Sequence, residues 1–132
     1  MTDAEFLAAL EGASLPPSCF RHGEHLRAAY LYLRQSGFEG AITRMRRALT
    51  GYAAAQGRPG LYHETITVAF LALVNERLQG RADQDWQTFA AGNRELFDKR
   101  YLSQYYRPET LASPRAREVF LLSRLSTGTE NS

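Results

Sequence analysis

The stretch Gly60-Leu61-Tyr62-His63-Glu64-Thr65 leads directly into the apolar run Ile66-Thr67-Val68-Ala69-Phe70-Leu71-Ala72-Leu73-Val74. Wound as a helix, this run is apolar on almost every side, which is typical of a helix that is buried in the core. Gly80 follows as a stop signal. We therefore predict a central, buried helix over about residues 62–78, with two titratable residues, His63 and Glu64, at its start.

Capping and breaking residues divide the rest of the chain into further helices. Thr2 and Glu5 have the spacing of a capping box, Gly37 stops one helix and precedes another, and Ser113-Pro114 is a typical helix start. Besides the central helix, we expect helices near residues 3–11, 18–36, 38–56, 84–100 and 115–125. In the helix over 84–100, the buried candidates are Trp86, Phe89, Ala90, Leu96 and Phe97.

No segment has the alternating pattern of a strand with a hairpin partner. The sequence therefore predicts an all-α fold. We expect a single compact orthogonal or antiparallel bundle of five to six helices, formed by residues 1–125, with residues 126–132 as a flexible tail.

Composition and charge limit the class of protein. Of the 132 residues, 44% are hydrophobic and 23% are charged, as in ordinary globular domains. The net charge of +2 is small and the basic residues are dispersed, so we expect no nucleic-acid partner. We interpret the cluster of Arg44, Arg46 and Arg47 as a solvated face and Lys99 as part of a surface charge cluster. A single cysteine, an acidic N-terminus without a signal-peptide pattern and no long apolar run predict a cytoplasmic protein without a membrane partner.

The three histidines fall in the first turns of predicted helices. His22 and His25 are three residues apart, so they face the same side of a helix, while Glu64 follows His63 directly. The positive end of a helix dipole lowers the pKa of a nearby histidine, and neutral imidazole is the form that binds metals. We predict that His22, His25, His63 and Glu64 together hold a divalent transition metal such as zinc, iron, copper or manganese.

Within that site, His63 and Glu64 are the catalytic candidates, with Glu64 as a ligand or general base and Tyr62 as a hydrogen-bonding neighbour. One alternative is a metal-free pocket for a small-molecule ligand, in which one histidine acts as the base and Glu64 orients it. Another alternative is a helical structural or protein-interaction module without chemistry. The sequence leaves the substrate, the reaction and the oligomeric state open.

Three groups of segments carry a resemblance to a known family. They are Phe20-Arg21-His22-Gly23-Glu24-His25-Leu26-Arg27-Ala28-Ala29, Gly60-Leu61-Tyr62-His63-Glu64-Thr65-Ile66-Thr67, and Tyr105-Tyr106 with Leu111-Ala112-Ser113-Pro114-Arg115-Ala116-Arg117. With them the chain resembles a family of small bacterial all-helical proteins of unassigned function, marked by His-x-x-His-Leu and Tyr-His-Glu-Thr-Ile-Thr segments. The resemblance implies that both histidine-bearing segments belong to one architecture, and it implies no particular activity.

Overall fold

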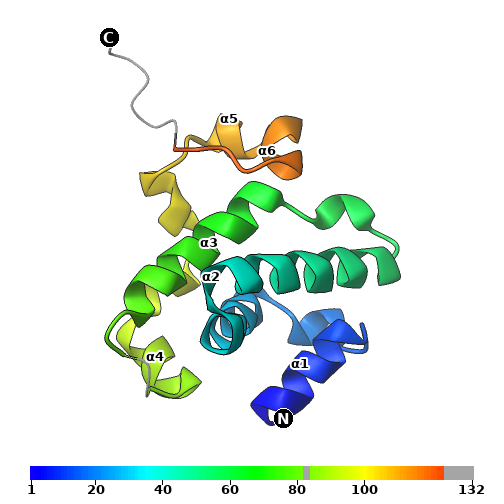
Figure 1. The fold of residues 1–132 in the computed structure, drawn as a ribbon. Coiled ribbons are helices and arrows are strands. Elements are labelled where there is room, and N and C mark those ends of the chain that lie inside the picture. The colour runs from blue at the N-terminus through cyan, green and yellow to red at the C-terminus, as the bar shows by residue number, and fades with distance from the viewer. Residues whose placement is uncertain (82–83, 124–132) are drawn as a thin grey trace.

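A computed structural model describes residues 1–81 and 84–123, and all regular structure in these ranges is helical. The α-helices are α1 (Asp3–Glu11), α2 (His22–Ala55), α3 (Glu64–Leu78), α4 (Trp86–Gly92), α5 (Pro108–Leu111) and α6 (Pro114–Glu118) (Figure 1). Short 3-10 helices connect them: η1 (Pro17–Cys19), η2 (Pro59–Leu61), η3 (Arg94–Phe97) and η4 (Lys99–Gln104). The predicted all-α fold is confirmed. No helix in the described ranges is long and apolar enough to cross a membrane.

Helix α1 begins with the predicted capping box. The Glu5 backbone N–H donates to the Thr2 hydroxyl at 3.1 Å, and the Thr2 N–H donates to the Glu5 carboxylate at 2.8 Å. These two bonds satisfy N–H groups that have no partner inside the helix. The helix thereby presents three buried side chains to the core: Phe6, Leu7 and Leu10.

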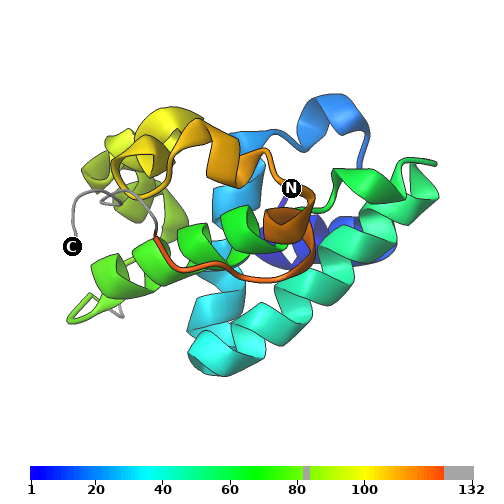
Figure 2. The same cartoon turned by 90° about the horizontal axis from the view of Figure 1, so that it is seen from above.

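Helix α2 is bent sharply at Gly37, the residue at which the sequence predicts that one helix stops and the next begins. Gly37 has φ 70° and ψ −177°, a combination that only glycine adopts readily. The halves over residues 22–36 and 38–55 consequently run in different directions (Figure 2). The second half lies beside α3, where its Arg46 pairs with Glu64.

Helix α3 lies at the centre of the fold, as predicted, and runs back along the second half of α2 (Figure 1). Its apolar run is largely buried, and Leu71 and Val74 are fully inaccessible. Burying such a side chain stabilises the fold by roughly 1.5–3 kcal/mol. The helix starts at Glu64, because His63 acts as its N-cap. The predicted start at residue 62 is therefore two residues early.

The helix predicted over residues 84–100 is interrupted at Asn93, which has φ −138° and ψ 46°. Asn93 is buried, its amide donates to the Phe89 carbonyl at 2.9 Å, and its oxygen accepts a hydrogen bond from Arg77 at 2.9 Å. Hydrogen bonds of this kind compete with helical backbone bonds. Two 3-10 helices follow instead of one helix, and Phe97, predicted to be buried, is 39% exposed.

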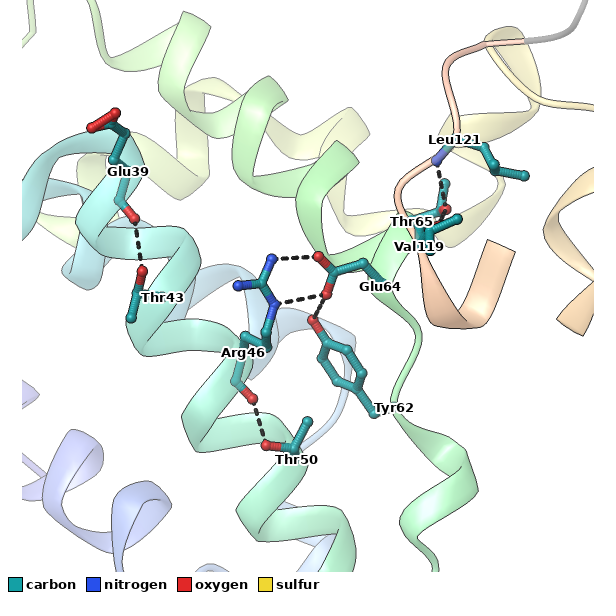
Figure 3. Close-up of polar contacts among 9 residues, drawn as sticks. All are labelled: Glu39, Thr43, Arg46, Thr50, Tyr62, Glu64, Thr65, Val119 and Leu121. Atoms are coloured by element: carbon teal, nitrogen blue, oxygen red, sulfur yellow. Dashed lines mark hydrogen bonds and ion pairs between the residues drawn. The ribbon is translucent and has the colours of Figure 1, made fainter. Parts of the chain in front are cut away.

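The last predicted helix, over residues 115–125, ends at Glu118. Residues 119–123, which we call the C-terminal strap, begin in an extended conformation at Val119. The buried Thr65 hydroxyl donates to the Val119 carbonyl at 2.8 Å and accepts from the Leu121 N–H at 3.1 Å (Figure 3). The strap thus satisfies a polar group at the start of α3. The predicted tail, 126–132, lies outside the described residues.

Candidate functional site

The three histidines line one pocket of about 440 Å³. Its walls come from η1 and the first turns of α2, the end of α2, η2, the first turns of α3, η4 and α5. Most of the wall is apolar, with Phe20, Leu49, Ile66, Phe70 and Leu102 as its larger members. The bend of α2 and the antiparallel course of α3 therefore bring together segments that are far apart in the sequence.

His22 is fixed in the wall of this pocket. Its Nε2 lies 2.9 Å from the carbonyl oxygen of Leu96, and because a carbonyl only accepts, Nε2 carries the proton. The ring also makes an edge contact with Phe70, with ring centroids 4.7 Å apart. Burial lowers the pKa of His22 below its ordinary value, so the ring is neutral at pH 7.

His25 is the histidine with unused hydrogen-bonding capacity. Its ring stacks on Phe20, with centroids 4.1 Å apart and an interplanar angle of 16°. Neither ring nitrogen has a hydrogen-bond partner in the described part of the chain. Burial, reinforced by the charges of His22 and Lys99, lowers the pKa of His25 to about 4. The neutral ring therefore has one nitrogen that donates and one that accepts.

His63 is committed to the fold through both ring nitrogens. Nδ1 accepts the backbone N–H of Ile66 at 3.1 Å and so caps α3. The proton is therefore on Nε2, which donates to the Leu111 carbonyl at 2.7 Å and ties α5 to α3. A metal would need a free nitrogen lone pair, and the one this neutral ring has, on Nδ1, already accepts the Ile66 N–H.

Glu64 faces α2 and does not line the pocket. Its carboxylate accepts two bonds from the Arg46 guanidinium, from Nε at 3.1 Å and Nη2 at 2.5 Å, and one from the Tyr62 hydroxyl at 2.5 Å (Figure 3). The Arg46 bonds are the main cause that lowers the pKa of Glu64. The predicted hydrogen bond of Tyr62 is present, and Glu64 is its acceptor.

The predicted ligand set is therefore not assembled. The carboxylate of Glu64 is engaged by Arg46 and Tyr62, and His63 has no free lone pair. Across residues 1–81 and 84–123, no three His, Cys, Asp or Glu side chains are grouped so that they could hold a metal ion. His22, His25, His63 and Glu64 do not fit a shared metal, and Glu64 is not placed to act as a base in the pocket.

Three cations at the pocket, Arg21, Arg58 and Lys99, were not predicted as site residues. All three are exposed, and none forms an ion pair with another described residue. They come from three separate segments, so no local spacing in the sequence links them. The interpretation of Lys99 as a plain surface charge missed its position beside the histidines.

Comparisons of the chain with protein-family models, with curated proteins and with solved structures give no significant match. The resemblance to a bacterial family therefore stays a prediction.

Proposed function

We propose that the protein binds a small, largely apolar organic molecule in the histidine pocket, without a metal. The observation that carries this proposal is His25, which offers a free donor and a free acceptor on the wall of an apolar pocket of about 440 Å³. Small-molecule sites are typically apolar hollows of about 300–1,000 Å³ with a few polar groups that orient the ligand.

Binding is favoured over catalysis by the acid-base character of the histidines. A general base works best when its pKa is near the working pH, and the pKa of His25 is lowered to about 4. His25 is thus a weak base at neutral pH but a good neutral hydrogen-bonding group. The ring of His25 would hold a polar group of the ligand, while Phe20 and Phe70 contact its apolar body.

The test is a ligand-detected NMR screen of small aromatic and aliphatic compounds against the wild-type protein and two variants. Ala53→Trp fills the pocket from its α2 wall, whereas Ala54→Trp adds the same side chain at the next, exposed position, outside the pocket. We expect hits that bind the wild type and Ala54→Trp but not Ala53→Trp. Hits that bind Ala53→Trp equally well would overturn the proposal.

His25→Phe provides a second readout if Ala53→Trp does not fold. Phenylalanine keeps an aromatic ring to stack on Phe20 but removes both ring nitrogens. Hits with a polar group should bind this variant about 5- to 20-fold more weakly, the effect of one lost hydrogen bond. Unchanged binding of every hit to His25→Phe would show that His25 does not hydrogen-bond the ligand.

A non-catalytic protein-interaction module is the second candidate, and exposed side chains of the C-terminal strap favour it. Val119 is 43%, Phe120 41% and Leu122 73% exposed. In that case, substitution of His22 or His25 by alanine would leave partner binding unchanged, and no small molecule would bind the pocket.

A further inference from the structure

The charged side chains that line the histidine pocket in the described part of the chain are all of one sign. Arg21, Arg58 and Lys99 line it, and no Asp or Glu is among its described lining residues. The whole chain has 16 basic and 14 acidic residues, so an all-cationic lining does not follow from composition. A hollow that is lined by one sign of charge concentrates ligands of the opposite sign.

Like several other described arginines, Arg47 among them, the three pocket cations form no ion pair with a described carboxylate. Six arginines in the described part of the chain form ion pairs with carboxylates: Arg27, Arg44, Arg46, Arg77, Arg100 and Arg107. The carboxylates that are close to the pocket cations in sequence are engaged elsewhere. Glu24 accepts the Arg21 backbone N–H at 2.7 Å, and Asp98 pairs with Arg100 at 2.9 Å. Arg21, Arg58 and Lys99 are therefore available to a ligand.

The field of Lys99 reaches the inner wall. Its charge is among the causes that lower the pKa of both His22 and His25, although Asp98 acts in the opposite direction on His22. A group that disfavours protonation of two neighbouring histidines stabilises a negative charge in the same space.

We infer that the ligand of the histidine pocket is an organic anion, with its acidic head group beside Lys99, Arg21 and Arg58 and its apolar body against Phe20 and Phe70. This inference rests on the proposed binding function and adds the class of ligand. An arginine guanidinium recognises both carboxylate and phosphate groups, so both head groups share the required chemistry. The Arg46–Glu64 pair, behind the wall, takes no part in recognition of the head group.

The experiment compares ligands that share one apolar body and differ in charge. Phenylbutanoate, phenylbutyl phosphate, the neutral phenylbutanamide and phenylbutylamine are titrated into the 132-residue protein, with binding followed by NMR at low ionic strength. We expect at least one of the two anions to bind about 10-fold or more tightly than the amide, and the amine to bind most weakly. The anion with the higher affinity shows whether the pocket prefers a carboxylate or a phosphate head group.

Variants that each remove one positive charge test which cations cause the preference for anionic ligands. Lys99→Gln and Arg58→Gln each remove one positive charge at the pocket, while Arg47→Gln removes the same charge from an exposed position on α2 outside it. We expect the pocket variants to weaken binding of the anions about 2- to 5-fold, to leave binding of the amide unchanged, and to reduce the salt dependence. Arg47→Gln should behave like the wild type.

The outcomes separate this inference from the function on which it rests. Equal affinity for anions and amide, with both lost in Ala53→Trp, would overturn the anionic class while keeping the pocket. An equal effect of Arg47→Gln and Lys99→Gln would overturn the role of the pocket cations. No binding of any of the four probes, together with a screen without hits, would remove both proposals.

Discussion

Glu64 is a buried residue, 8% exposed, and its carboxylate accepts three hydrogen bonds, two from Arg46 and one from Tyr62. Glu64→Gln keeps the shape but replaces a charge-assisted pair by a neutral one beside a half-exposed Arg46. We expect a loss of about 1–2 kcal/mol in the free energy of unfolding, measured by urea denaturation at neutral pH.

Arg100→Gln is the control for this prediction. It breaks an ion pair whose arginine side chain is 88% exposed, so we expect a loss below about 0.5 kcal/mol. If Glu64→Gln and Arg100→Gln lose the same free energy, the partly buried pair contributes no more than a surface pair, and the structural role given to Glu64 is wrong.

His25 makes stability depend on pH. Because its pKa is lowered to about 4 in the folded state, the unfolded chain binds the proton more readily below its ordinary pKa of 6.5. The neutral His25 ring contributes fully to the free energy of unfolding above about pH 6.5, and this contribution is lost as the pH falls toward about 4. Between about pH 7.5 and about pH 5, we expect His25 to cause a loss of up to about 2 kcal/mol, measured by denaturation at both values.

His25→Phe is the comparison for the pH prediction, because it removes the titrating ring. Its unfolding free energy should change less over the same interval, with a remainder from His22, whose pKa is also lowered. The same pH dependence in wild type and His25→Phe would show that His25 does not carry it.

At the residue scale, the sequence predicted that the histidines meet, and all three line one pocket. The lowered pKa predicted for such histidines is found for His22 and His25, although burial is its main cause. The sequence did not predict that Arg46 binds Glu64, since helical spacing shows that two residues share a face but not which helix packs on that face. For the same reason, the sequence did not show that the carboxylate predicted as a ligand is engaged by Arg46 and Tyr62.

The bend of α2 depends on one residue. Gly37→Ala places a side chain on a backbone with φ 70° and ψ −177°, although there is open space around it. We expect a loss of about 1–3 kcal/mol in unfolding free energy from this strain alone. Thermal or urea denaturation measures it.

Gly51→Ala is the matched control on the same helix. Gly51 has helical geometry and nothing within 4 Å of an added methyl group, so alanine should stabilise the protein by about 0.5–1 kcal/mol. Gly37→Ala and Gly51→Ala should thus change the free energy of unfolding in opposite directions. A stabilising Gly37→Ala would contradict the observed bend.

The Thr65 hydroxyl joins α3 to the C-terminal strap. Thr65→Val keeps the volume of this inaccessible side chain but leaves the Val119 carbonyl and the Leu121 N–H without their partner. We expect a loss of about 1–3 kcal/mol. Hydrogen exchange at the Leu121 amide should also become faster.

Thr43→Val is the control for Thr65→Val. Thr43 is exposed, and among the described residues its hydroxyl bonds only the Glu39 carbonyl of its own helix, so we expect a change within about 0.5 kcal/mol in the free energy of unfolding (Figure 3). Unchanged exchange at Leu121 in Thr65→Val would show that the strap is held by other contacts.

At the element scale, predictions that rest on local chemistry were confirmed. The Thr2 capping box, the Ser113 N-cap and the stop at Gly37 are all present. The helix over 84–100 and the last helix failed where distant residues offered competing partners, Arg77 to Asn93 and Thr65 to the strap. Neither interaction can be predicted from the local sequence pattern, because the partners are far apart in the chain.

For the whole molecule, the predicted transition metal remains to be measured. Because the four proposed ligands do not converge, we expect less than about a tenth of an equivalent of any transition metal after purification without chelator. Elemental analysis, followed by titration with zinc, provides the measurement. Stoichiometric uptake that is lost in His22→Ala and His63→Ala would contradict the observed engagement of His63 and Glu64 in hydrogen bonds within the fold.

The contact between Thr65 and the C-terminal strap has a consequence for the order in which the chain folds. The two bonds connect residues that are 54 and 56 positions apart in the sequence, so closing them requires a long loop. During synthesis, the central helix emerges well before the residues that satisfy its buried hydroxyl. Docking of the strap should therefore be a late kinetic step, and Thr65→Val should accelerate unfolding while leaving the rate of refolding nearly unchanged.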